Sequence, residues 1–298
     1  MNRVSAVLLV FFLISCGSGQ SGEDKSTSLP EPEIAKNDKK YVVPQTLKEI
    51  SGISFIADSI VVAIEDEKGL LYFFDLGKQQ IIKTYQFGDE EDYEDVAVVD
   101  NTVYIVTSTG HILEIPNFKT KPSPTKVYNT PLKTKNNIEG LTYDKDNNRL
   151  LLAVKDEGLH DDINKDIYAF DLKTNQLNTT AVYSIKLKEI EEFYRGDKLE
   201  ETSKKFLKAF GNEKLNKVFR TSALAIHPKT KDIYVLSSLN NMIAVLAADN
   251  GKIKNIIELR GKDYNQPEGL AFAPDGRLYV SNESNGKIAN IIRIKHEQ

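Results

Sequence analysis

A short pattern that recurs five times along the chain constrains its fold more than any other feature. In each copy a polar residue is followed by a small or short one, and then by apolar, small and apolar residues. The copies are Ser51–Phe55, Glu94–Val98, Glu139–Tyr143, Ser222–Ile226 and Glu268–Phe272. Apolar residues at alternate positions are typical of a β-strand, and small residues between them let strands crowd around an axis.

Each copy is followed by a turn and a second strand. The turns are rich in Asp, Asn, Pro and Gly, which favour β-hairpins. The second strands are Val61–Glu65, Val103–Thr107, Leu151–Lys155, Ile233–Ser237 and Leu278–Asn282. The copies start at positions separated by 43, 45, 83 and 46 residues, and further strands follow within most intervals. A period of about 40 to 50 residues with three or four strands predicts an all-β propeller.

The interval of 83 residues decides the number of blades, because it spans about two periods and leaves six blades as the alternative. Apolar residues in Lys188–Arg195 and Leu199–Phe210 recur at helical spacing, and this region lacks the turn and second strand of the repeat. We therefore predict five blades with a short helical insertion in the third. The last copy has no fourth strand of its own, and residues 40–47 (KYVVPQTL) are expected to supply it.

The first sixteen residues are typical of a lipoprotein signal peptide. Arg3 precedes an apolar run, Val7–Ile14, that is far shorter than the roughly 20 residues needed to span a bilayer. Leu13–Gly17 resembles a lipobox, in which Cys16 would carry the lipid. An ordinary cleaved signal or a buried strand are the alternatives. The sequence predicts an exported protein, lipid-anchored to a bacterial membrane, with the outer membrane as the expected one.

Residues 17–39 contain Gly, Ser, Pro and charged residues with almost nothing apolar, so we expect a flexible tether. The propeller domain is then expected to cover residues 40–298. The net charge of −4 offers no basic footprint for nucleic acid, so none is expected as a partner. Cys16 is the only cysteine, which excludes a disulfide and a Cys/His zinc site in the domain. We expect a monomer.

The polar residues that open the repeats predict a site. The start of a first strand and the end of a second lie at the same end of a hairpin, so both sets should meet on one rim of the axis. We expect a metal site formed by Glu94, Glu139, Glu268, Glu65 and Asn282. Carboxylates this close either raise a pKa or bind a cation, and an all-oxygen set suits Ca²⁺. Lys155 could instead neutralise part of the ring.

Two other roles for these glutamates stay open. They could be structural and accept backbone N–H groups of a neighbouring blade, or they could act as acid and base or activate water through a metal. The leading hypothesis is a membrane-tethered, extracytoplasmic propeller that binds a small-molecule or protein ligand, with calcium at the rim. The alternative is a metal-dependent hydrolase, lactonase-like or phosphoesterase-like, that uses the same rim.

Four segments resemble the SdiA-regulated family of bacterial propeller lipoproteins, which is distantly similar to NHL-repeat and phytase-like propellers. The segments are Lys48–Gly52, Tyr93–Asp95, Asn137–Tyr143 and Gln266–Phe272. The resemblance implies a five-bladed fold and a calcium site. The insertion at residues 188–218 departs from the family's plain pattern.

Overall fold

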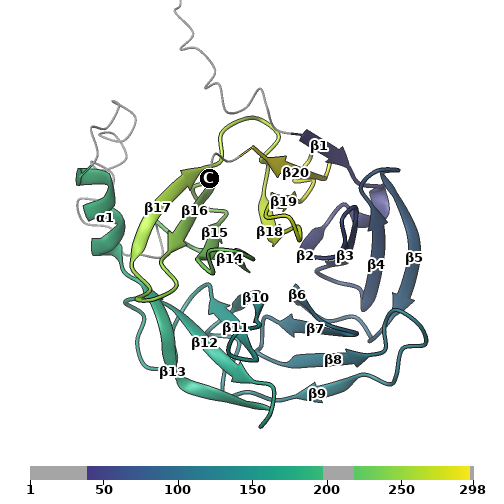
Figure 1. Ribbon diagram of the computed structural model, residues 1–298, viewed down its shortest axis with the longest axis horizontal. Helices are drawn as coiled ribbons and strands as arrows, with labels where there is room; N and C mark the ends of the chain where they lie inside the picture. The colour runs from purple at the N-terminus through teal and green to yellow at the C-terminus, as the bar shows by residue number, and fades with distance from the viewer. Residues whose placement is uncertain (1–38, 197–217, 296–298) are drawn as a thin grey trace, which may run out of the picture. The chain divides into compact units, whose positions relative to one another are not determined.

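The computed structural model describes residues 39–196 and 218–295, which form five four-stranded antiparallel sheets around one axis (Figure 1). The five-bladed propeller is confirmed. The predicted signal peptide at 1–16 with Cys16, the tether up to residue 38, and the helical spacing at Leu199–Phe210 lie outside the described residues. No helix among the described residues is long and apolar enough to cross a membrane.

Each blade runs from an inner strand at the axis to an outer strand. Blade 1 contains β2 (Ile50–Ala57), β3 (Ile60–Glu65), β4 (Leu70–Asp75) and β5 (Gln80–Gln86). Blade 2 contains β6 (Tyr93–Val99), β7 (Thr102–Thr107), β8 (Ile112–Pro116) and β9 (Lys126–Tyr128). Blade 3 contains β10 (Ile138–Asp144), β11 (Arg149–Val154), β12 (Lys165–Asp171) and β13 (Gln176–Ile185).

Blade 4 contains β14 (Thr221–Ile226), β15 (Ile233–Ser237), β16 (Met242–Leu246) and β17 (Ile253–Glu258). Blade 5 contains β18 (Pro267–Phe272), β19 (Leu278–Asn282), β20 (Asn290–Ile294) and β1 (Lys39–Val42). The five copies of the repeat thus form the inner strands β2, β6, β10, β14 and β18, which surround the centre of Figure 1.

The N-terminal strand closes the ring, as predicted. β1 pairs with β20 in antiparallel register, with Tyr41 opposite Ile291, and becomes the outer strand of blade 5. The buried ring of Tyr41 lies 6.2 Å from that of Tyr279. The strand is shorter than the predicted residues 40–47, because Pro44 ends it and Gln45–Leu47 form a 3-10 helix whose Leu47 is fully buried.

The predicted helical insertion is also confirmed in its described part. Helix α1 (Leu187–Gly196) follows β13 and lies beside β17 on the outside of the ring (Figure 1). Its Ile190 is fully buried against Ile185 and Phe219, within the apolar cluster between blades 3 and 4. The beginning of the insertion is therefore anchored in the core.

The core is divided into five apolar clusters, and each combines residues of two adjacent blades. The cluster between blades 5 and 1, for example, contains Tyr279 beside Phe74 and Ile53. Each blade is therefore held on both sides by apolar packing, so the ends of the inner strands stand on a rigid frame.

Candidate functional site

A β-bulge lies at the same point of every inner strand and turns the opening residue of each repeat toward the rim. The pairing of inner and second strands shifts register at this point in all five blades. The residues left out of the pairing include Ser51, Glu94, Glu139, Ser222 and Glu268. A bulge inserts one residue and re-aims its side chain, which is why this position can differ from the strand around it.

The three opening glutamates lie together at one end of the axis. Burial raises the pKa of Glu94 to about 10, and the charges of Glu139, Asp92 and Glu268 add to the rise. Burial and the charge of Glu139 likewise raise the pKa of Glu268 to about 7. Glu139 is 4% exposed and shares a hydrogen bond with Glu94. One of these two carboxyls must hold a proton for that bond to form. The bond lowers the pKa of Glu139, which is the effect of accepting a hydrogen bond, so Glu94 is the donor.

Lys155 supplies positive charge to this cluster, as the sequence allowed. Its Nζ lies 2.8 Å from Oε1 of Glu139. Burial opposes its protonation, but the charges of Glu139, Glu268 and Glu94 outweigh burial and raise the pKa of Lys155. The ammonium group therefore stays charged and partly neutralises the ring.

Two acids beside the ring were not predicted as site residues. Burial and the charge of Glu268 raise the pKa of Glu283 to about 8. Burial and the charge of Glu49 raise the pKa of Asp66 to about 6, and Asp66 Oδ1 is buried without a hydrogen-bond partner. Gln266 donates from Nε2 to Glu283 at 2.6 Å and also hydrogen-bonds Glu268.

The structure does not bring Glu65 and Asn282 into this cluster. Glu65 accepts from Lys68 Nζ at 2.8 Å and lies beside Tyr72, within its own blade. Asn282 donates to Oδ1 of Asn290 at 3.0 Å on the neighbouring strand. Because side chains alternate across a strand, the next residues, Asp66 and Glu283, face the ring instead. The alternation of side chains between the two faces of a strand was the signal that could have identified Asp66 and Glu283.

The serines that open blades 1 and 4 bind backbone rather than the ring. Ser51 Oγ donates to the carbonyl of Glu94, and Ser222 Oγ donates to the carbonyl of Pro267 at 2.9 Å. In both cases the acceptor belongs to the next blade along the chain. These two positions therefore fasten adjacent blades, while the glutamate positions carry charge.

The described part of the ring offers calcium no preformed site. Among residues 39–196 and 218–295, no three His, Cys, Asp or Glu side chains are placed to hold a metal ion. The Lys155 ammonium already contacts Glu139 where a cation would bind. A cation could bind these carboxylates only after the Lys155 side chain turns away. Asp66 Oδ1 is buried beside the ring and has no hydrogen-bond partner, so a bound cation would give it a partner.

The chain matches the SdiA-regulated family over residues 26–286. It belongs to that family. No curated protein matches it. The propeller of this SdiA-regulated protein is similar to the glutaminyl cyclase of Myxococcus xanthus, with a TM-score of 0.55 at 14% identity over 86% of this chain and 94% of that one. A streptogramin B lyase has a TM-score of 0.46 at 11% identity over 87% of this chain and 97% of the lyase. At such identities the likeness to the cyclase establishes the fold alone.

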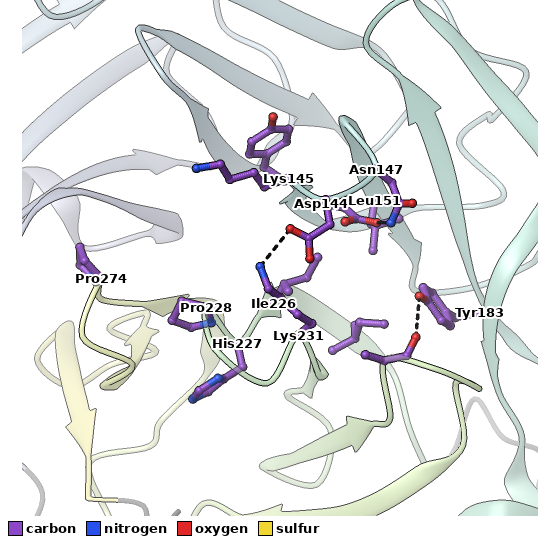
Figure 2. Close-up of a pocket in the computed structure, with 14 residues that line it drawn as sticks. Asp144, Lys145, Asn147, Leu151, Tyr183, Ile226, His227, Pro228, Lys231 and Pro274 are labelled. Atoms are coloured by element: carbon purple, nitrogen blue, oxygen red, sulfur yellow. Dashed lines mark hydrogen bonds and ion pairs between the residues drawn. The ribbon is translucent and has the colours of Figure 1, made fainter.

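The opposite face of this SdiA-regulated protein carries a pocket of about 590 Å³, lined by polar and apolar residues, between blades 3 and 4 (Figure 2). It lies over the hairpin turns, so it is remote from the acidic rim. Lys231 Nζ spans the pocket wall to Asp146 at 3.1 Å, and Tyr183 donates to the carbonyl of Ala248 at 3.4 Å. His227 is buried, and its Nδ1 accepts backbone N–H groups of the turn. These contacts hold the hairpin turns together, so these side chains of the pocket have a structural role.

Proposed function

We propose that this protein is an exported, lipid-anchored propeller that binds a positively charged ligand group at its acidic rim. The observation that carries the proposal is the convergence of Glu94, Glu139 and Glu268, whose pKa values are all raised by burial. Keeping buried carboxyls together is unfavourable in the absence of a ligand, and groups that weaken a fold in this way are typical of binding sites.

Positive charge could come from two sources: a divalent cation, of which calcium is the one expected from oxygen ligands, or the ammonium or guanidinium group of a small molecule or protein. Either would favour the ionised carboxylates and so release protons on binding at pH 7. The two kinds of ligand differ in whether they displace the ammonium group of Lys155. A metal ion must displace its ammonium from Glu139, whereas an organic ligand can bind beside it.

Titration calorimetry tests the proposal. We expect calcium chloride or an organic probe, methylguanidinium or putrescine, to bind wild-type protein with an enthalpy that depends on the buffer's ionisation, since protons are released. Glu94→Gln and Glu268→Gln should weaken binding at least tenfold, a loss of about 1.4 kcal/mol. Lys155→Gln should strengthen the binding of calcium more than that of the organic probe, because only the metal ion has to displace the ammonium group.

Glu114→Gln is the matched control, because Glu114 lies on blade 2 bonded to Lys126 and Tyr128, away from the rim. It should bind each probe as wild type does. Absence of binding by calcium and by both organic probes at millimolar concentration, or equal loss in Glu114→Gln, would contradict the proposal.

A specific pair of groups favours hydrolysis as a second candidate function. Glu268 and Glu283 have pKa values of about 7 and 8, and Gln266 contacts both. Carboxyls that titrate near neutral pH can exchange protons with a substrate as acid and base. Turnover of lactones or phosphodiesters, with and without added calcium, that is lost in Glu268→Gln would support this function. Ligand binding without turnover would support the first.

The lipid anchor has its own test in Cys16→Ser. We expect wild-type protein to partition into the detergent phase of Triton X-114 and the variant to move to the aqueous phase or remain unprocessed, because the thiol that carries the lipid is gone. Ser15→Ala is the control, since it keeps a small residue before the cysteine. A Cys16→Ser variant that is cleaved as wild type is and still partitions into the detergent phase would contradict lipidation.

A further inference from the structure

Asp95 places a carboxylate where the other inner strands have almost no side chain. The equivalent residues, second in each copy of the repeat, are Gly52, Gly140, Ala223 and Gly269. Asp95 is only 1% exposed. A Cβ on Gly52 of the adjacent blade would lie 2.4 Å from Asp95 Oδ1, so this side chain fills the space that its neighbours leave.

The carboxylate of Asp95 accepts hydrogen bonds from the backbone of three blades. Oδ1 accepts the N–H of Val96 at 2.8 Å, and Oδ2 accepts the N–H of Leu141 at 2.7 Å. A third backbone hydrogen bond comes from Leu224. Val96, Leu141 and Leu224 hold the same position in blades 2, 3 and 4, the third of each repeat.

Inner strands have one edge without a ladder partner, so their buried N–H groups need another acceptor. Backbone N–H groups that converge on one point form an anion-binding concavity. Burial raises the pKa of Asp95 well above its ordinary value, and the hydrogen bonds from Leu141, Val96 and Leu224 act against this rise because they favour the anion. Both oxygens of Asp95 act as acceptors, which matches the ionised form.

We propose that the propeller axis contains an anion-binding site built from the backbone N–H groups of three blades, and that the Asp95 carboxylate is its built-in occupant. The ligand class that fits this site is a small carboxylate. The proposal concerns the axis below the rim and does not depend on the proposed function.

Residues around this site also line a pocket on the face opposite the rim. This pocket has a volume of about 220 Å³ and is lined by residues of all five inner strands, including Val96, Leu141 and Leu224. These residues carry the three N–H groups that bind Asp95. Removal of the Asp95 side chain would therefore expose the N–H groups to an anion that enters through this pocket.

Chemical rescue of Asp95→Gly tests the proposal. We expect the variant to melt about 6 °C or more below wild type, since three buried hydrogen bonds and the side chain are lost. Formate or acetate should raise its melting temperature, or its refolding yield, in a saturable manner. Pivalate at the same ionic strength should not, because it is too large for the vacated space.

Asp75→Gly is the matched control. Asp75 also accepts two backbone N–H groups, from Gly77 at 2.8 Å and Lys78 at 3.1 Å, but in a surface turn. Formate should shift neither this variant nor wild type. An equal formate effect in all three proteins, or none in Asp95→Gly, would overturn the proposal.

Asp95→Asn keeps the inference testable should Asp95→Gly fail to fold. The amide keeps the size of the side chain but replaces one acceptor oxygen with an N–H donor that faces a backbone N–H. We expect a lower melting temperature that formate does not restore, because the side chain still fills the site. A melting temperature equal to that of wild type would overturn the proposal.

Discussion

Glu94→Gln is expected to stabilise the protein at pH 8 by about 2 kcal/mol, although it removes a rim carboxylate. The pKa of Glu94 is raised from its ordinary value of 4.5 to about 10, mainly by burial and by Glu139. Glutamine has a similar shape and no charge, so it removes the unfavourable interaction. This gain is smaller than the free energy that corresponds to the whole rise in the pKa of Glu94, because nearby groups adjust to the substitution.

The pH dependence of this effect has a definite sign. Between pH 4.5 and about 10 the folded protein binds more protons at Glu94 than the unfolded chain does. The free energy of unfolding therefore falls as the pH rises through this window. The Glu94 carboxyl is fully compatible with the fold below pH 4.5 and most unfavourable near pH 10. The advantage of Glu94→Gln should consequently be small at pH 5 and larger at pH 9.

Urea denaturation of both proteins at pH 5, 8 and 9 measures this difference. Glu114→Gln serves again as the control, and it should lose stability slightly because its carboxylate contacts Lys126 and Tyr128. A Glu94→Gln variant that is less stable than wild type at pH 9 would contradict the electrostatic description of the rim. It would instead favour a structural role for Glu94.

The second large effect is expected from truncation. A chain that begins at Pro44 lacks β1 and should lose about 4 kcal/mol or more of stability. Burial of Tyr41 and Val43 is lost, and β20 is left as an unpaired edge. A chain that begins at Pro32 keeps β1 and should unfold as the longer protein does.

Thermal and urea denaturation of the two truncated chains, with size-exclusion chromatography, measure the contribution of the closing strand. The chain from Pro44 should also associate, because an exposed strand edge pairs readily with another copy. Equal stability of the two chains would show that β1 contributes little and that four blades and an open fifth sheet are sufficient.

The fold could be predicted well from the sequence because several independent features of the repeat indicate the same architecture. The opening pattern, the hairpin turns and the period of the repeat agree with one another, so an error in one strand boundary changes nothing in the architecture. Lys188–Arg195 also revealed its helix, because it breaks the strand pattern and shows helical spacing at the same time.

The site could be predicted only in part. The repeat identified Glu94, Glu139 and Glu268, since equivalent positions in a ring must meet at one rim. It missed Asp66 and Glu283, because the last residue of each second strand was chosen, whereas the residue that follows the strand end faces the ring. The buried Lys165 was also missed. It donates to the carbonyls of Lys155 and Asp156 and so supports the loop that carries the rim lysine.

Asp95 shows a different limit of sequence analysis. Its place in the repeat was visible in the sequence. A short polar residue at a position where the other repeats have Gly or Ala, however, does not indicate where its side chain points. Its bonds to Leu141 and Leu224 connect positions 46 and 129 residues away along the chain. Only the closed ring brings these backbone groups to one point.

The position of β1 has a mechanical consequence. In a chain held at its N-terminus, a pull on the domain travels along the backbone and reaches Lys39 before any other strand residue that the structure describes. The hydrogen bonds between β1 and β20 would bear that load first. Tension at the N-terminus would thus act directly on the strand that closes the ring, so that detachment of β1 would set the force at which the propeller opens.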